Sequence, residues 1–96
     1  FAEAASDNII GLIEGSDPAL KDEIVLLTAH LDHVGVDEGG KPGEDVINNG
    51  AIDNASGVAV LIEAAGMFKR ARGAPRRTIA FAAVTAEEKG LIGSDY

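Results

Sequence analysis

Three short segments of the sequence carry side chains that could bind a metal ion or move a proton. His30 and Asp32 are two positions apart, and Asp53 lies among small residues. Glu87 and Glu88 are adjacent. Imidazole and carboxylate groups together suit zinc or a similar divalent ion. Of two adjacent carboxylates, one can hold the metal while the other serves as a general base, which is the division that metal-assisted hydrolysis needs.

Each segment also has an interpretation without chemistry. His30 could be a strand-end histidine that is hydrogen-bonded by Asp32. Asp53 stands where a helix begins and could be a plain N-cap. Glu87 and Glu88 could be a solvated acidic pair in a loop. The functional interpretation is favoured because all three segments are predicted to lie at one edge of one sheet.

The elements that position these residues follow from the hydrophobic pattern. Residues 8–14 and 24–29 are predicted strands, and the short connection between them predicts an antiparallel hairpin. The apolar run at 78–85 predicts a further buried strand. Residues 35–50, in which glycines are scattered among acids and asparagines, are expected to form a long irregular loop.

The helix between these strands has the clearest signal. Asp53 or Asn54 is its predicted N-cap, and apolar side chains recur at helical spacing from Val58 to Phe68. Gly73 is placed to stop it. Strand, helix and strand predict a right-handed βαβ unit, so the fold class is α/β with a partial mixed sheet. Ligands in such folds gather at the carboxyl ends of the parallel strands, where the candidate residues fall.

Composition excludes several classes of function. The formal net charge is −8, which argues against a nucleic-acid or anionic-membrane partner. The chain has no cysteine, which excludes disulfides and a thiolate zinc site. Its longest apolar runs are short, so no transmembrane segment is predicted.

Three motifs occur in an order that resembles the co-catalytic di-zinc aminopeptidases, a family of bacterial zinc-dependent exopeptidases. They are AHLD at 29–32, GAIDNASG at 50–57 and TAEEKGLIGS at 85–94. Residues 8–18 resemble the lead-in of the family's bacterial members. The resemblance implies a three-layer α/β zinc-exopeptidase fold. It also implies a metalloprotease that hydrolyses N-terminal residues from peptide substrates.

The resemblance implies a role for each candidate residue. His30 and Glu88 would each ligate one of two zinc ions, and Asp53 would bridge both. Asp32 would brace His30, and Glu87 would be the general base that takes a proton from the metal-activated water. A cis peptide bond is implied after Asp53. The family also implies an extracellular or cell-envelope location.

The chain departs from the family in length. Members of the family are longer and take a further Asp and a His from later segments. Residues 1–96 are therefore expected to be part of a catalytic domain whose C-terminal half is missing, inactive alone and at best a weak metal binder. His33 could substitute for the missing imidazole or be a surface-loop histidine. The helix and the strand at 78–85 are expected to expose apolar surface and to cause self-association.

Two other functions fit parts of the pattern. A zinc carboxypeptidase or a glutaminyl cyclase of the same superfamily would share the scaffold and differ in the residues that line the substrate pocket. A non-catalytic ectodomain could keep the fold as a binding module, and loss of ligands would be its signature. The three ligand positions and Glu87 are intact, which favours the enzyme.

Overall fold

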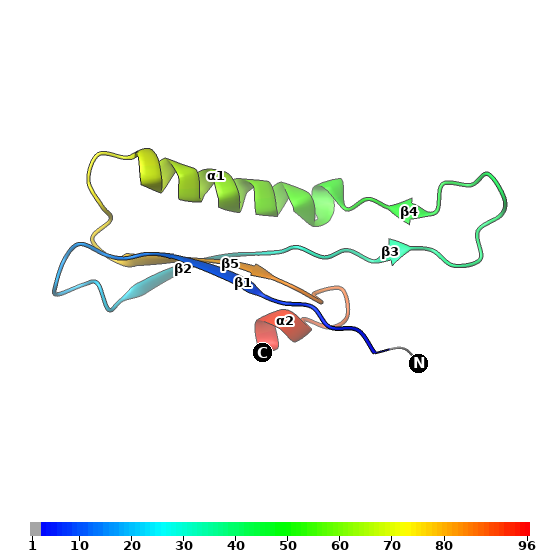
Figure 1. Ribbon diagram of the computed structural model, residues 1–96, viewed down its shortest axis with the longest axis horizontal. Coiled ribbons are helices and arrows are strands. Elements are labelled where there is room, and N and C mark those ends of the chain that lie inside the picture. The colour runs from blue at the N-terminus through cyan, green and yellow to red at the C-terminus, as the bar shows by residue number, and fades with distance from the viewer. Residues whose placement is uncertain (1–2) are drawn as a thin grey trace.

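The computed structural model describes residues 3–96 and has a mixed sheet flanked by two helices. The sheet contains β1 (Ile9–Ile13), β2 (Ile24–His30) and β5 (Thr78–Val84) in the order β1-β5-β2. Strand β5 is parallel to β2 and antiparallel to β1. Figure 1 shows α1 (Ser56–Arg70) along one side of the strands and the short α2 (Ile92–Asp95) on the other. The predicted α/β class and the parallel pairing of 24–29 with 78–85 are confirmed.

The predicted hairpin between residues 8–14 and 24–29 is wrong, because β5 lies between β1 and β2. The connection from β1 crosses the start of β5 and is tied to it. Gly15 N–H donates to Thr78 Oγ1 at 2.9 Å, and the same hydroxyl donates to the carbonyl of Lys21 at 2.6 Å. A connection of this length can therefore pass over one strand as well as form a hairpin. Residues 78–82 are all buried, so β5 takes the central position where both of its edges are hydrogen-bonded.

The segment before α1 differs from a plain helix start. Residues Ala51–Ala55 form a wide π-helical turn in which Asp53 and Asn54 have non-helical backbone angles, and the peptide bond between these two residues is cis. Helix α1 begins at Ser56 with Ala55 as its N-cap, one or two residues after the predicted N-cap at Asp53 or Asn54. Asn54 still supports the first turn, because its Oδ1 accepts the Gly57 N–H at 3.0 Å. The cis bond implied by the family resemblance is confirmed.

The predicted irregular loop at 35–50 contains a small hairpin. Strands β3 (Gly35–Val36) and β4 (Ile47–Asn48) pair antiparallel, and between them the chain makes an extended excursion. In Figure 1 this hairpin points away from the main sheet, beyond the start of α1. The prediction of irregular structure is therefore correct only for the remainder of the segment.

The core lies between α1 and the face of the sheet formed by β2 and β5. It is centred on four buried residues: Ala29, Leu61, Ile79 and Phe81. Phe68 of α1 packs edge to face on Phe81, with ring centroids 6.2 Å apart. This packing fixes α1 over the sheet, and so fixes the turn that carries Asp53 at the carboxyl end of β2.

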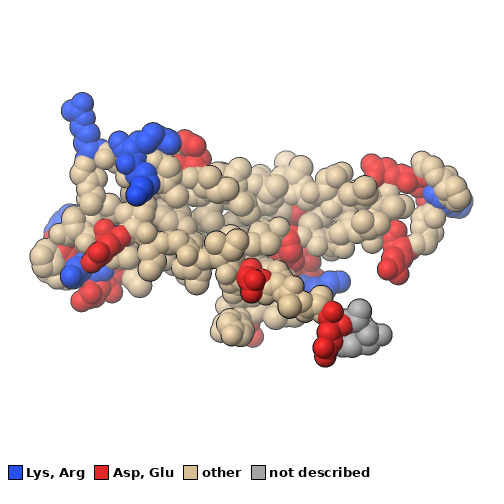
Figure 2. All heavy atoms as spheres, in the orientation of Figure 1, with Lys and Arg blue, Asp and Glu red and all other residues tan. Residues whose placement is uncertain are grey.

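Much apolar surface is left uncovered. The accessible surface is 7328 Å², whereas a compact monomer of this mass exposes roughly 5,200 Å². The exposed large apolar residues include Ile9, Ile10 and Leu12 of β1, Ile24 and Leu26 of β2, and Val60, Ile62 and Met67 of α1. Figure 2 shows most of the visible Lys and Arg at the end where α1 terminates, with smaller basic groups at the opposite tip and below the centre. Exposure of the helix is confirmed, but the predicted exposure of 78–85 is wrong because both sheet neighbours and α1 cover that strand.

The apolar character of α1 has a second implication. Within residues 3–96, the helical segment Ala51–Arg70 is the one that is long and apolar enough to cross a membrane by length and composition alone. One stripe of it, with Val58, Leu61 and Phe68, packs against the sheet. Some of the apolar side chains of α1 are therefore explained by packing in the core. The expected absence of a transmembrane segment stays a prediction.

Candidate metal centre

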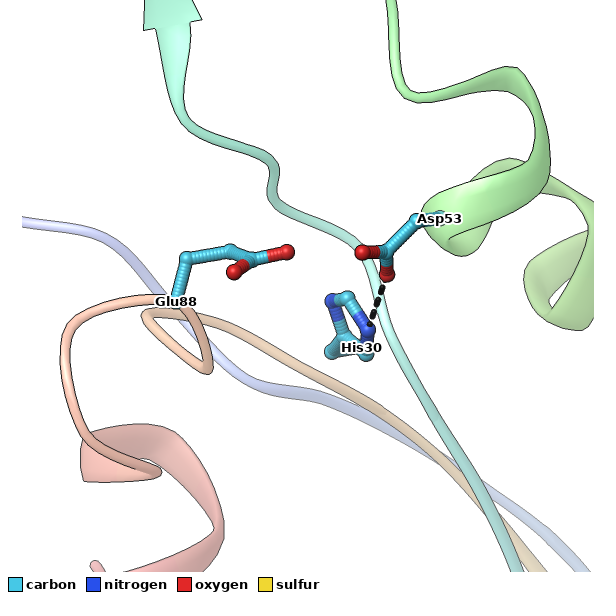
Figure 3. Close-up of side chains that lie close together, drawn as sticks. All are labelled: His30, Asp53 and Glu88. Carbon is cyan, nitrogen blue, oxygen red and sulfur yellow. Dashed lines mark ion pairs between the residues drawn. The ribbon is translucent and has the colours of Figure 1, made fainter.

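Three segments that are distant in sequence bring His30, Asp53 and Glu88 together (Figure 3). His30 ends β2, Asp53 lies in the turn before α1, and Glu88 follows β5. One ligand atom from each residue lies within 4.8 Å of the others. The parallel register explains this convergence, because His30 pairs with Val84 and both strands end at the same edge of the sheet.

Both ring nitrogens of His30 face oxygen acceptors. Nε2 lies 3.0 Å from Oδ1 of Asp53, and Nδ1 lies 3.1 Å from the backbone carbonyl oxygen of Asp32. A neutral imidazole has one N–H donor and cannot satisfy both contacts. The contact between Nε2 and Asp53 therefore needs either one further proton or a cation. Because Nδ1–H donates to the carbonyl, Nε2 is the atom available to such a cation.

The electrostatic surroundings of His30 favour positive charge. Partial burial on its own disfavours the protonated ring and lowers the pKa. The Asp32 carbonyl and the carboxylates of Glu87, Asp53 and Asp32 outweigh this effect and hold the pKa of His30 above its ordinary value. An imidazole surrounded by several carboxylates is an arrangement suited to a bound cation.

The carboxylate of Asp32 has a different principal contact from the predicted one. Its Oδ1 lies 3.7 Å from His30 Nδ1, farther than the Asp32 carbonyl oxygen. The carboxylate accepts the backbone N–H groups of Glu87 at 3.1 Å and Glu88 at 3.4 Å. Burial raises the pKa of Asp32, but these two N–H groups and His30 bring it below its ordinary value. Asp32 thus contacts His30 mainly through its backbone and uses its side chain to hold the loop after β5.

Glu87 lies at the rim of the cluster. Its Oε2 is 3.9 Å from His30 Nε2, and its side chain is one-third exposed. The backbone of Glu87 is held by Asp32 while its carboxylate remains open to solvent. This position suits a group that exchanges protons with water near His30. Its role as general base remains a prediction.

His33 belongs to the same cluster, a position that its spacing in the sequence did not indicate. Its Nδ1 lies 3.1 Å from Oε1 of Glu88 and 4.0 Å from Oδ2 of Asp53. The two oxygens of Asp53 therefore face different imidazoles, Oδ1 toward His30 and Oδ2 toward His33. The chain after β2 is irregular, so neither helical nor strand periodicity predicts where His33 points. The only sequence signal is its proximity to His30.

Comparison with known proteins gives one family and several relatives. The sequence profile of Peptidase family M28 matches residues 8–96. A probable zinc metalloprotease of Leptosphaeria maculans is 34% identical over 89 residues, covering 93% of this chain and 19% of the relative. Aminopeptidase YwaD of Bacillus subtilis is 35% identical over 96 residues, which is 100% of this chain and 18% of the relative. Aminopeptidase NAALADL1 of Rattus norvegicus is 36% identical over 94 residues, 93% of this chain and 10% of the relative.

The matched region is a small part of each of these proteins. The chain spans less than a fifth of the length of these three relatives, the largest share being 19%. No solved structure gives a significant match.

Proposed function

Because this chain belongs to peptidase family M28, we propose that it supplies His30, Asp53 and Glu88 as ligands of a zinc centre that hydrolyses N-terminal residues from peptides. Relatives named zinc metalloprotease support the metal, and relatives named aminopeptidase support the direction of cleavage over a carboxypeptidase. Two zinc ions are part of the proposal, and Asp53 would be a residue that holds both. The interpretation of residues 1–96 as part of a larger catalytic domain also belongs to the proposal.

The observation that carries the proposal is the convergence of one ligand atom each from His30, Asp53 and Glu88 within 4.8 Å of one another, and the contacts of His30 fit it. Nε2 of this ring faces a carboxylate oxygen at 3.0 Å while Nδ1 faces a carbonyl at 3.1 Å. A cation at Nε2 allows a neutral ring to keep its Nδ1–H contact while Nε2 acts as a ligand, and a second ring proton would satisfy the same two acceptors in its absence. Nitrogen and carboxylate oxygen are the ligands that catalytic zinc takes, so the donor chemistry fits the metal.

The residues have distinct tasks in the proposed reaction. Zinc, when bound, supplies a Lewis acid that polarises the peptide carbonyl and makes water a better nucleophile near neutral pH. Glu87 accepts a proton from the attacking water and returns it to the departing amine as the peptide C–N bond breaks. Asp32 holds the backbone of Glu87 and Glu88, which keeps both carboxylates at the cluster. The free amine of the substrate pairs with the carboxylates of the site.

The 96-residue chain alone is expected to bind zinc weakly and to show no turnover of an aminoacyl p-nitroanilide. The reason is that the cluster offers few ligands for two metal ions among residues 3–96. Isothermal titration with zinc and a nitroanilide assay at saturating zinc measure the two properties. Absence of zinc binding would contradict the metal centre. Robust turnover by this chain would contradict its expected inactivity.

We also propose that the chain self-associates through the exposed apolar faces of β1, β2 and α1. Ile10 is 67% exposed and Ile62 is also 67% exposed, on different elements. Exposed large apolar side chains on several elements favour association. Light scattering coupled to size exclusion is expected to show dimers or larger species, and Ile62→Lys is expected to shift the distribution toward monomer. A monomer at millimolar concentration would contradict this proposal.

A further inference from the structure

His33 occupies a defined position between two of the proposed ligands. Its side chain is 26% exposed, and its Nδ1 lies 3.1 Å from Oε1 of Glu88. The same nitrogen lies 4.0 Å from Oδ2 of Asp53, beyond hydrogen-bond distance. The contact with Glu88 is therefore the specific one. This contact uses Oε1 of Glu88, and the ring of His33 does not occupy Oε2 of the same carboxylate.

A second observation shows that the turn before α1 accommodates this ring. Gly50 has a positive φ of 67°, and a Cβ atom at this residue would lie 2.9 Å from the Cβ of His33 and 3.2 Å from its Cγ. A side chain at position 50 would therefore collide with the stem of the imidazole. The turn that carries Asp53 and the ring of His33 pack closely only because residue 50 is glycine.

We propose that His33 is a positioning residue of the metal centre, whose Nδ1–H donates to Oε1 of Glu88 and orients that carboxylate toward His30 and Asp53. The inference rests on the proposed function, because it assigns His33 to the same site. Groups that hold a ligand by hydrogen bonds typically change metal affinity by about 10- to 100-fold when they are removed. His33 acts in this way on Glu88, as Asp32 does on the backbone of the same loop.

The experiment compares cobalt binding by the wild-type chain with that by His33→Ala and His33→Asn. Cobalt(II) replaces zinc and reports the ligand set through its visible absorption bands, and a chromophoric chelator measures its affinity by competition. His33→Ala is expected to weaken binding by about 10- to 100-fold with the band positions unchanged, because the ligands stay the same. His33→Asn is expected to restore most of the affinity, since its Nδ2–H can replace the Nδ1–H donor.

The controls separate a local effect from general disturbance of the loop. Val34→Ala changes the next residue, which is 48% exposed, and is expected to bind cobalt as the wild-type chain does. Circular dichroism of each metal-free variant verifies the fold. The inference would be overturned if His33→Ala bound cobalt with wild-type affinity. It would also be overturned if the Ala and Asn variants lost cobalt affinity equally. A change of bands in His33→Ala that marks the loss of a nitrogen ligand would also overturn it. A wild-type chain that binds no cobalt would overturn the proposed function itself, and this inference with it.

Discussion

Replacing Asp53 by asparagine is expected to lower zinc affinity by more than about 100-fold, beyond the range typical for groups that only support a ligand. Asp53 directs Oδ1 to His30 and Oδ2 toward His33, so it faces both sides of the cluster. Asparagine retains the size of the side chain but loses its charge and one of its two oxygen ligands. The fold should survive, because the Asp53 side chain is 58% exposed.

Asp22→Asn is the matched control for this change. Asp22 is exposed and lies in the connection between β1 and β2, so the substitution removes the same charge far from the cluster. Titration calorimetry of both variants against zinc, with circular dichroism to verify the fold, measures the effect. If Asp53→Asn binds zinc within a few-fold of the Asp22→Asn variant, Asp53 is not a ligand.

Replacing Phe81 by alanine is expected to destabilise the chain by about 3–5 kcal/mol. Phe81 is 7% exposed, lies on the central strand and contacts Phe68 edge to face. Its removal leaves a cavity between α1 and the sheet that neighbouring side chains can fill only in part. Single domains typically have about 5–15 kcal/mol of stability, and this chain buries less surface than a compact domain, so the variant should be largely unfolded.

Ile10→Ala provides the comparison on an exposed strand position. Ile10 is 67% exposed on β1 and pairs with Ala82, so its truncation should cost less than about 1 kcal/mol. Urea denaturation followed by far-ultraviolet circular dichroism measures the change in the free energy of unfolding for both variants, at a concentration where each variant is monomeric. If Phe81→Ala and Ile10→Ala lower the free energy of unfolding equally, the core does not lie between α1 and β5.

Much of the site's position could be predicted from the sequence. The apolar runs at 24–29 and 78–85 and the helical spacing between Val58 and Phe68 define a βαβ unit. Parallel strands must end at the same edge, which brings His30 and the residues after β5 together without any knowledge of side-chain contacts. The approximate location of the cluster thus follows from periodicity and topology.

Other features depended on information that periodicity does not contain. The length of the connection at 14–23 allows either a hairpin or a passage over one strand, and burial of β5 on both faces decided between them. Asp32 presents its backbone carbonyl to His30 and its side chain to the loop of Glu87, and neither contact follows from periodicity because the chain after β2 is irregular. The contact of His33 depends on the same irregular backbone.

Zinc-edge anomalous scattering from crystals of this chain grown with zinc would locate the metal independently of any activity. We expect the strongest peak to contact Nε2 of His30 and the carboxylates of Asp53 and Glu88, at zinc–ligand distances of about 2.0–2.2 Å. Peaks only at other carboxylates, such as those of the hairpin formed by β3 and β4, with none at His30, would contradict the proposed metal centre.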